Sequence, residues 1–116
     1  MTRILSVSYD LALLSSRRLL LESLGYHVVS AADFPEAMQQ CQSGARFDLF
    51  VLGHSIPGPD KENLITAFRA RRAAPVIALK RPGEEPAAEA DFYIDPEPGQ
   101  LLAVVSGIIS SHAASA

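Results

Sequence analysis

Short runs of apolar residues alternate along this chain with longer stretches in which apolar residues recur every three or four positions. The short runs are typical of strands, and the longer spacing is typical of helices that face a core. Parallel strands need a crossover, usually a helix, so this alternation predicts an α/β domain with a mostly parallel sheet. The expected strands lie at residues 4–7, 28–29, 49–52, 76–79 and 92–94.

Residues that favour helix ends lie between the expected strands. Asp10, Asp33 and Asp60 precede helical patterns and can each cap a helix N-terminus, and Gly25 suits the left-handed position at a helix end. A crossover that contains a helix needs about 10–12 residues at minimum. The segment 80–90 barely meets that length and contains two prolines, so we expect the fourth helix to be shortened or missing.

Length and composition predict one domain and exclude several classes of partner. The chain has 116 residues, 48% of them hydrophobic, which is enough for one core; we expect a domain over residues 1–110 and a flexible tail over 111–116. A net charge of −3 argues against nucleic-acid binding, which needs a basic surface. No stretch approaches the roughly 20 apolar residues of a membrane span, and no signal peptide is recognisable, so we expect a cytoplasmic protein without membrane contact.

Reactive side chains are few, and each has a structural explanation. The single Cys41 lies in a helical apolar pattern, which favours a buried thiol over a reactive one. The three histidines show no ligand spacing, so we expect no zinc site. Arg69, Arg71 and Arg72 either dock an acidic partner or interact with the carbonyl end of a helix, and the sequence favours the second explanation.

Five segments, in this order and at this spacing, resemble the receiver domains of bacterial response regulators. They are RILSV (3–7), LGYHVV (24–29), FDLFVL (47–52), IPGPD (56–60) and PVIAL (75–79). The resemblance spans nearly the whole chain. It implies a CheY-like, flavodoxin-like fold: three α/β/α layers around a five-stranded parallel sheet in the order 2-1-3-4-5.

The positions that carry phosphorylation in this family all differ here. A working receiver takes a phosphoryl group on an aspartate at the end of the third strand, and an acidic pair after the first strand holds magnesium. A Ser or Thr after the fourth strand and a Lys after the fifth contact the phosphoryl group. In this chain the acidic pair is replaced by Ser8 and Tyr9, the acceptor by Gly53, the hydroxyl by Lys80 and the lysine by Asp95.

These replacements remove the chemistry as well as the pattern. Gly53 has no carboxylate to act as nucleophile, so we expect neither a phosphoacceptor nor a catalytic residue. The neutral hydroxyls of Ser8 and Tyr9 are poor magnesium ligands, so we expect no metal and no cofactor. The resemblance therefore implies a non-enzymatic pseudo-receiver of a two-component or phosphorelay system. Such a module acts by protein–protein interaction, with a homodimer left open.

Three charged residues that follow expected strands, Asp10, Lys80 and Asp95, have alternative roles. Asp10 is either a remaining magnesium ligand or a helix cap, and its position favours the cap. Lys80 either pairs with Asp10 or Asp95, as a fixed substitute for the lost cation, or is solvated. Asp95 most simply starts the turn before the last helix.

Two rival functions remain open. The first is a small-molecule-binding or catalytic α/β domain that reuses the degenerate pocket, which comprises Ser8, Tyr9, Asp10, Gly53, Lys80 and Asp95. No glycine-rich phosphate loop or catalytic triad pattern supports it. The second is phosphorylation at a displaced aspartate, for which the candidates are Asp10, Asp48 and Asp60.

Overall fold

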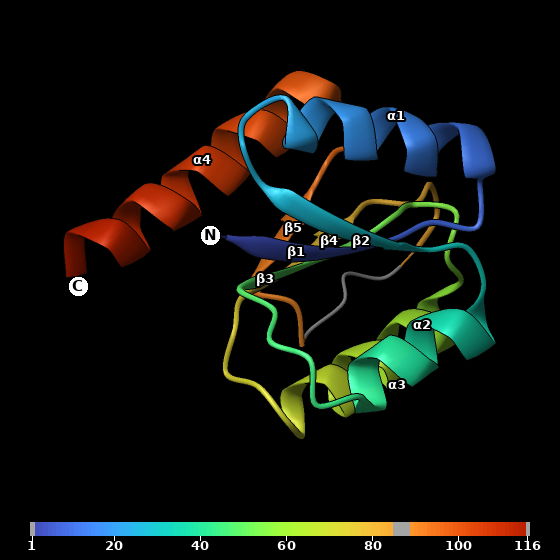
Figure 1. The fold of residues 1–116 in the computed structure, drawn as a ribbon. Helices are drawn as coiled ribbons and strands as arrows, with labels where there is room; N and C mark the ends of the chain where they lie inside the picture. The colour runs from blue at the N-terminus through green and yellow to red at the C-terminus, as the bar shows by residue number, and fades with distance from the viewer. Residues whose placement is uncertain (1, 85–88, 116) are drawn as a thin grey trace.

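A computed structural model describes residues 2–84 and 89–115, with side chains as far as residue 111. A five-stranded sheet lies between two pairs of helices (Figure 1). The elements are β1 (Arg3–Val7), α1 (Leu11–Glu22), β2 (His27–Ala31), α2 (Phe34–Gln42), β3 (Leu49–Leu52), α3 (Gly58–Arg69), β4 (Val76–Leu79), β5 (Phe92–Ile94) and α4 (Pro98–Ser115). All strand pairs are parallel, in the order β2-β1-β3-β4-β5, which confirms the predicted fold class.

Alternating strand residues build two cores, one on each face of the sheet. Phe50 and Leu52 pack with α2 and α3, whereas Leu49 and Val51 pack with α1 and α4. All four are buried, as expected for a central strand covered on both faces. Residue 53 directly follows β3, so it lies at the carboxyl end of a strand that is buried on both faces.

Two of the predicted caps form as expected. The Asp10 Oδ1 atom accepts a hydrogen bond of 3.1 Å from the Leu13 amide, and Asp33 Oδ1 accepts one of 2.8 Å from the Glu36 amide. Gly25 has a φ of 88°, in the left-handed region that favours glycine after a helix. The first two helices therefore begin at the predicted capping residues, and Gly25 follows α1 as expected.

The predicted cap of the third helix is wrong. Helix α3 begins at Gly58, with Pro57 at the N-cap position and no side-chain capping bond. Pro59 has a φ suited to the first helical turn, and its missing N–H needs no partner there, so the helix starts before Asp60. The Asp60 carboxylate does not cap α3 and instead accepts a hydrogen bond from Tyr9, in the loop that follows β1.

The connection between β4 and β5 contains no helix in the residues that the structure describes. A turn closes from the Glu84 amide to the Arg81 carbonyl at 3.1 Å, and the described chain resumes at residue 89. This agrees with the prediction that the helix between the fourth and fifth strands is shortened or missing, although residues 85–88 lie outside the described part of the chain.

The C-terminal helix is longer than the sequence suggested. The backbone of α4 stays helical through Ser115, and residue 116 lies outside the described range; the flexibility of a tail over 111–116 stays a prediction. Residues 111–115 contain no proline or glycine to stop the helix. In the described residues, no helix has the length and apolarity that crossing a membrane requires.

Candidate functional site

The carboxyl ends of the strands bring most of the predicted site residues to one edge of the sheet. Ser8 follows β1, Gly53 follows β3, Lys80 follows β4 and Asp95 follows β5. Strands β1 and β3 are neighbours, and the Gly53 amide donates a 2.8 Å hydrogen bond to the Val7 carbonyl. Open α/β sheets bind ligands at the carboxyl ends of their strands, so this edge is the candidate functional site.

The guanidinium of Arg17 fills the space beside Gly53. A Cβ atom placed on Gly53 would lie 2.9 Å from Arg17 Nη1, 3.0 Å from the Val7 carbonyl oxygen and 3.1 Å from Ser8 Cβ. Arg17 comes from α1 and is only 7% exposed. Glycine is therefore the residue that fits at position 53, because any side chain there would displace Arg17.

Arg17 is a buried cation with few partners. Its Nη2 lies 3.3 Å from His54 Nδ1, and its buried Nη1 has no hydrogen-bond partner among the described residues. Burial lowers the pKa of Arg17, and the Asp10 carboxylate partly opposes this shift. Burial, together with the charges of Arg17 and Lys61, lowers the pKa of His54. A neutral His54 can accept the bond from Arg17, whereas a protonated one would repel it.

The hydroxyls after β1 are engaged within the protein. Ser8 is fully buried, and its Oγ lies 3.2 Å from Ser55 Oγ; Ser55 Oγ also accepts a 3.0 Å bond from the Tyr9 amide. The Tyr9 hydroxyl donates a 2.8 Å bond to Asp60 Oδ2. Burial and the Asp60 carboxylate raise the pKa of Tyr9 well above its usual value. These contacts tie the β1 loop to α3, and Asp10 caps α1 as described above.

Lys80 lies near Asp95, as one of the two predicted arrangements requires. The Lys80 Nζ atom is 3.9 Å from Asp95 Oδ1, with the two side chains 47% and 61% exposed. A pair this exposed contributes about 0–1 kcal/mol to stability, so it restrains geometry rather than holding the fold together. The Asp95 amide also donates a 3.2 Å bond to Gln100 Oε1, which links the turn to α4.

A buried ion pair that the sequence analysis missed closes the loop after β4. Lys61, on α3, is fully buried, and its Nζ donates to the Leu79 carbonyl at 2.9 Å and to Glu84 Oε1 at 2.8 Å. The Tyr93 hydroxyl adds a 3.4 Å bond to the same Glu84 oxygen. Lys61 was detectable, because its spacing from Leu64 and Phe68 places it on the apolar stripe of α3.

Arg72, which follows α3, and the single cysteine have structural roles. Arg72 donates to the carbonyl oxygens of Cys41 at 2.8 Å, Ser43 at 2.8 Å and Ala45 at 2.9 Å. It therefore meets the carbonyl end of α2, not that of its own helix as the sequence suggested. Burial raises the pKa of the Cys41 thiol to about 12, which makes it unreactive.

Comparisons with known proteins identify the fold. No protein-family model matches the chain, and no curated protein sequence does. The structure is similar to a CheY-like receiver domain protein of Methanospirillum hungatei, with a TM-score of 0.80 and 24% identity over 100% of this chain and 99% of that one. A two-component response regulator of Clostridium difficile gives 0.81 and 22%, over 95% and 97%. A Thermotoga maritima response regulator in complex with Mg²⁺ and BeF gives 0.79 and 22%, over 93% and 99%. The chain has the fold of response-regulator receiver domains.

Proposed function

We propose that this receiver-fold domain is a pseudo-receiver, a cytoplasmic signalling module of a two-component or phosphorelay system that accepts no phosphoryl group and acts by binding a protein partner. The position of Arg17 carries the proposal. Its Nη1 lies 2.9 Å from the point where a Cβ of residue 53 would stand. A cation of the chain itself fills the place of an acceptor side chain, and Gly53 has no carboxylate to react.

The residues at this edge do not fit the magnesium ion that the chemistry of the family implies. Magnesium takes oxygen ligands in near-octahedral geometry and usually needs one or two carboxylates. The Ser8 hydroxyl contacts Ser55 and the Asp10 backbone, and the Tyr9 hydroxyl is bonded to Asp60. The buried charge of Arg17 would also repel a second cation nearby. No phosphoryl-transfer step through a metal is supported here.

The alternative acceptor aspartates are each engaged elsewhere. Asp10 caps α1, and the Asp60 carboxylate accepts the Tyr9 hydroxyl at 2.8 Å. Asp48 precedes β3, at the opposite edge of the sheet, and its Oδ2 accepts a 2.9 Å bond from the Arg3 amide. These contacts disfavour a displaced phosphorylation site.

The small-molecule rival has less support. A hollow of about 280 Å³ includes Lys80 and Asp95, but Ser8 and Gly53 are buried, and Arg17 fills the space beside Gly53. Of the charged residues that line this hollow, Lys80 and Asp95 face each other as an exposed pair, and Glu84 is already bonded to Lys61. Protein binding through an outer face requires no such cavity, which favours an interaction module over an enzyme.

The variant Gly53→Asp restores a carboxylate at the acceptor position and tests whether that is enough to restore phosphorylation. We expect it to remain unmodified by acetyl phosphate with magnesium, because the new carboxylate would pair with Arg17 and no acidic pair is present to hold the metal. Intact mass spectrometry measures the outcome. An acid-labile gain of one phosphoryl group on Asp at position 53 would show that the surrounding site is still competent, and would contradict the proposal.

The matched control is Gly53→Asn, which has the same shape without the charge. If Arg17 faces position 53, the Asp variant should be more stable to urea than the Asn variant by about 1 kcal/mol or more, as expected for a hydrogen bond between charged groups. Equal stability of the two variants would mean that Arg17 does not face this position.

A further inference from the structure

Two adjoining hollows form a groove at the opposite edge of the sheet from Arg17. One holds about 460 Å³ and the other about 530 Å³, and they share Pro75 and Ile108. Pro75 precedes β4 and Phe92 begins β5, so the groove lies at the amino ends of the strands, under the second half of α4. In Figure 1 this part of α4 runs past the sheet. We call it the α4 groove.

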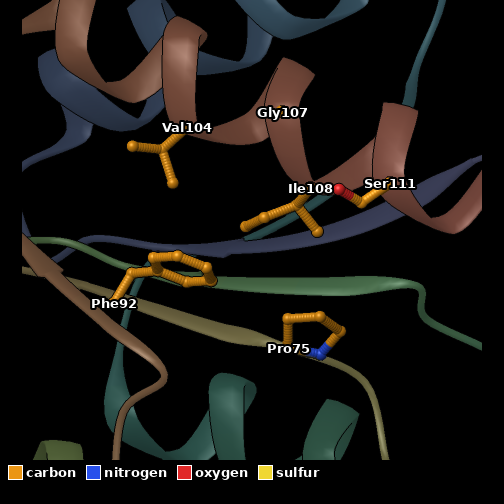
Figure 2. A pocket seen from close by; sticks show the side chains of 6 residues that line it. All are labelled: Pro75, Phe92, Val104, Gly107, Ile108 and Ser111. Atoms are coloured by element: carbon orange, nitrogen blue, oxygen red, sulfur yellow. The ribbon is translucent and has the colours of Figure 1, made fainter.

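One half of the α4 groove is apolar. Figure 2 shows Val104 and Ile108 on the α4 side, facing Phe92 and Pro75 across an open space. Phe92 is 39% exposed, which is unusual for a large aromatic side chain. Helix α4 also carries no ionisable residue from position 98 to position 111. This half could bury an apolar side chain of a partner without stranding a charge.

The other half of the groove is basic. Arg46 and Arg72 line it, and Arg69 and Arg71 line hollows that adjoin it. The carboxylates beside them are Asp48 and Asp91, so the charged residues lining these hollows carry an excess of two positive charges. The whole chain has a net charge of −3, so this edge is opposite in sign to the rest of the protein.

The two outermost arginines are the ones available to a partner. Arg72 is committed to the carbonyl oxygens at the end of α2, and Arg69 pairs with Asp91 at 2.5 Å. Arg46 is 77% exposed and makes one 3.0 Å ion pair with Asp48. Arg71 is exposed, and no ion pair to it is found among the described side chains.

We propose that the α4 groove docks a protein segment in which acidic residues lie next to an apolar anchor. The anchor would cover Phe92 and Val104, and the acidic residues would meet Arg46 and Arg71. The inference rests on the proposed function, that of a protein-binding module, and adds the chemistry of the partner. Opposite charges across an interface steer association and select partners, whereas a buried apolar anchor supplies most of the affinity.

A titration followed by NMR tests the groove with a defined probe. The probe is an end-blocked peptide of alternating Glu and Leu, added to the ¹⁵N-labelled full chain; the control peptide has Lys in place of every Glu. We expect shifts in the amides of Arg46, Phe92 and Val104 with the acidic peptide, weakened by salt. The double variant Arg46→Glu, Arg71→Glu should bind about tenfold more weakly or worse. The control variant Arg18→Glu changes an exposed arginine of α1 that does not line the groove, and should bind the acidic peptide as well as wild type does.

Other outcomes overturn the inference. These are shifts at a different face, no shifts with the acidic peptide, equal binding of the lysine peptide, or no effect of the double variant. Concentration-dependent self-association that the double variant abolishes would assign the groove to a second copy instead, and would also overturn it. None of these results bears on whether the chain accepts a phosphoryl group, so failure here is distinguishable from failure of the proposed function.

Discussion

Replacing Glu84 with alanine is expected to lower the free energy of unfolding by about 3–5 kcal/mol, because the charge of Lys61 would stay buried without its counter-charge. The Lys61 side chain is wholly buried, and that of Glu84 is only 10% exposed. After the change, the Leu79 carbonyl at 2.9 Å would be the remaining hydrogen-bond partner of Lys61 Nζ among the described residues, and the Tyr93 ring, with its centroid 6.0 Å away, carries no full counter-charge. Urea denaturation monitored by circular dichroism measures the difference.

Two comparisons separate the buried pair from ordinary charge effects. The double variant Lys61→Met, Glu84→Gln should be close to wild type, since methionine fills a similar space and no charge is left stranded. Glu22→Ala removes an exposed pair with Arg18 on α1 and should cost about 0.5 kcal/mol or less. If Glu84→Ala costs no more than Glu22→Ala, then Lys61 reaches water in solution.

Replacing Arg17 with methionine is expected to raise the free energy of unfolding by about 1–3 kcal/mol. A buried donor without a partner costs about that much, and Arg17 Nη1 is buried and unpartnered among the described residues. Methionine is flexible and can fill the same volume between α1 and Gly53 without a charge. His54 is part-exposed, so its Nδ1 can bond to water when Arg17 is gone.

The control for this variant lies one residue further along the same helix. Arg18→Met removes an exposed arginine and a 3.3 Å pair with Glu22, and should change stability by about 0.5 kcal/mol or less. Thermal and urea denaturation of both variants give the comparison. If Arg17→Met is clearly less stable than Arg18→Met, the buried guanidinium of Arg17 stabilises the fold, and the prediction is wrong.

The fold was predictable because its signals are local. The apolar runs mark β3 and β4 to the residue, and the capping aspartates at 10 and 33 mark the helix starts. The start of α3 was predicted wrongly because two prolines define it better than Asp60 does. The end of α4 was missed because small, uncharged residues give no stop signal.

The candidate site was only partly predictable, because its contacts join residues distant in the chain. The sequence indicated which residues lie at the strand ends, and the Lys80 to Asp95 distance agrees with one predicted arrangement. It did not indicate that Arg17 reaches Gly53 or that Lys61 reaches Glu84. Arg17 and Lys61 both lie at core-facing positions of their helices, where the helical spacing of apolar residues predicts an apolar side chain such as leucine. A charged residue on such a stripe is the signal that sequence analysis could have used.

The central claim is that this receiver fold accepts no phosphoryl group, and one measurement tests it most directly. The wild-type chain is incubated with acetyl phosphate and magnesium, and its intact mass is measured before and after acid treatment. We expect no change in mass, because Gly53 offers no carboxylate and Arg17 occupies the space beside it. An acid-labile gain of one phosphoryl group, mapped to any aspartate of the chain, would contradict the account.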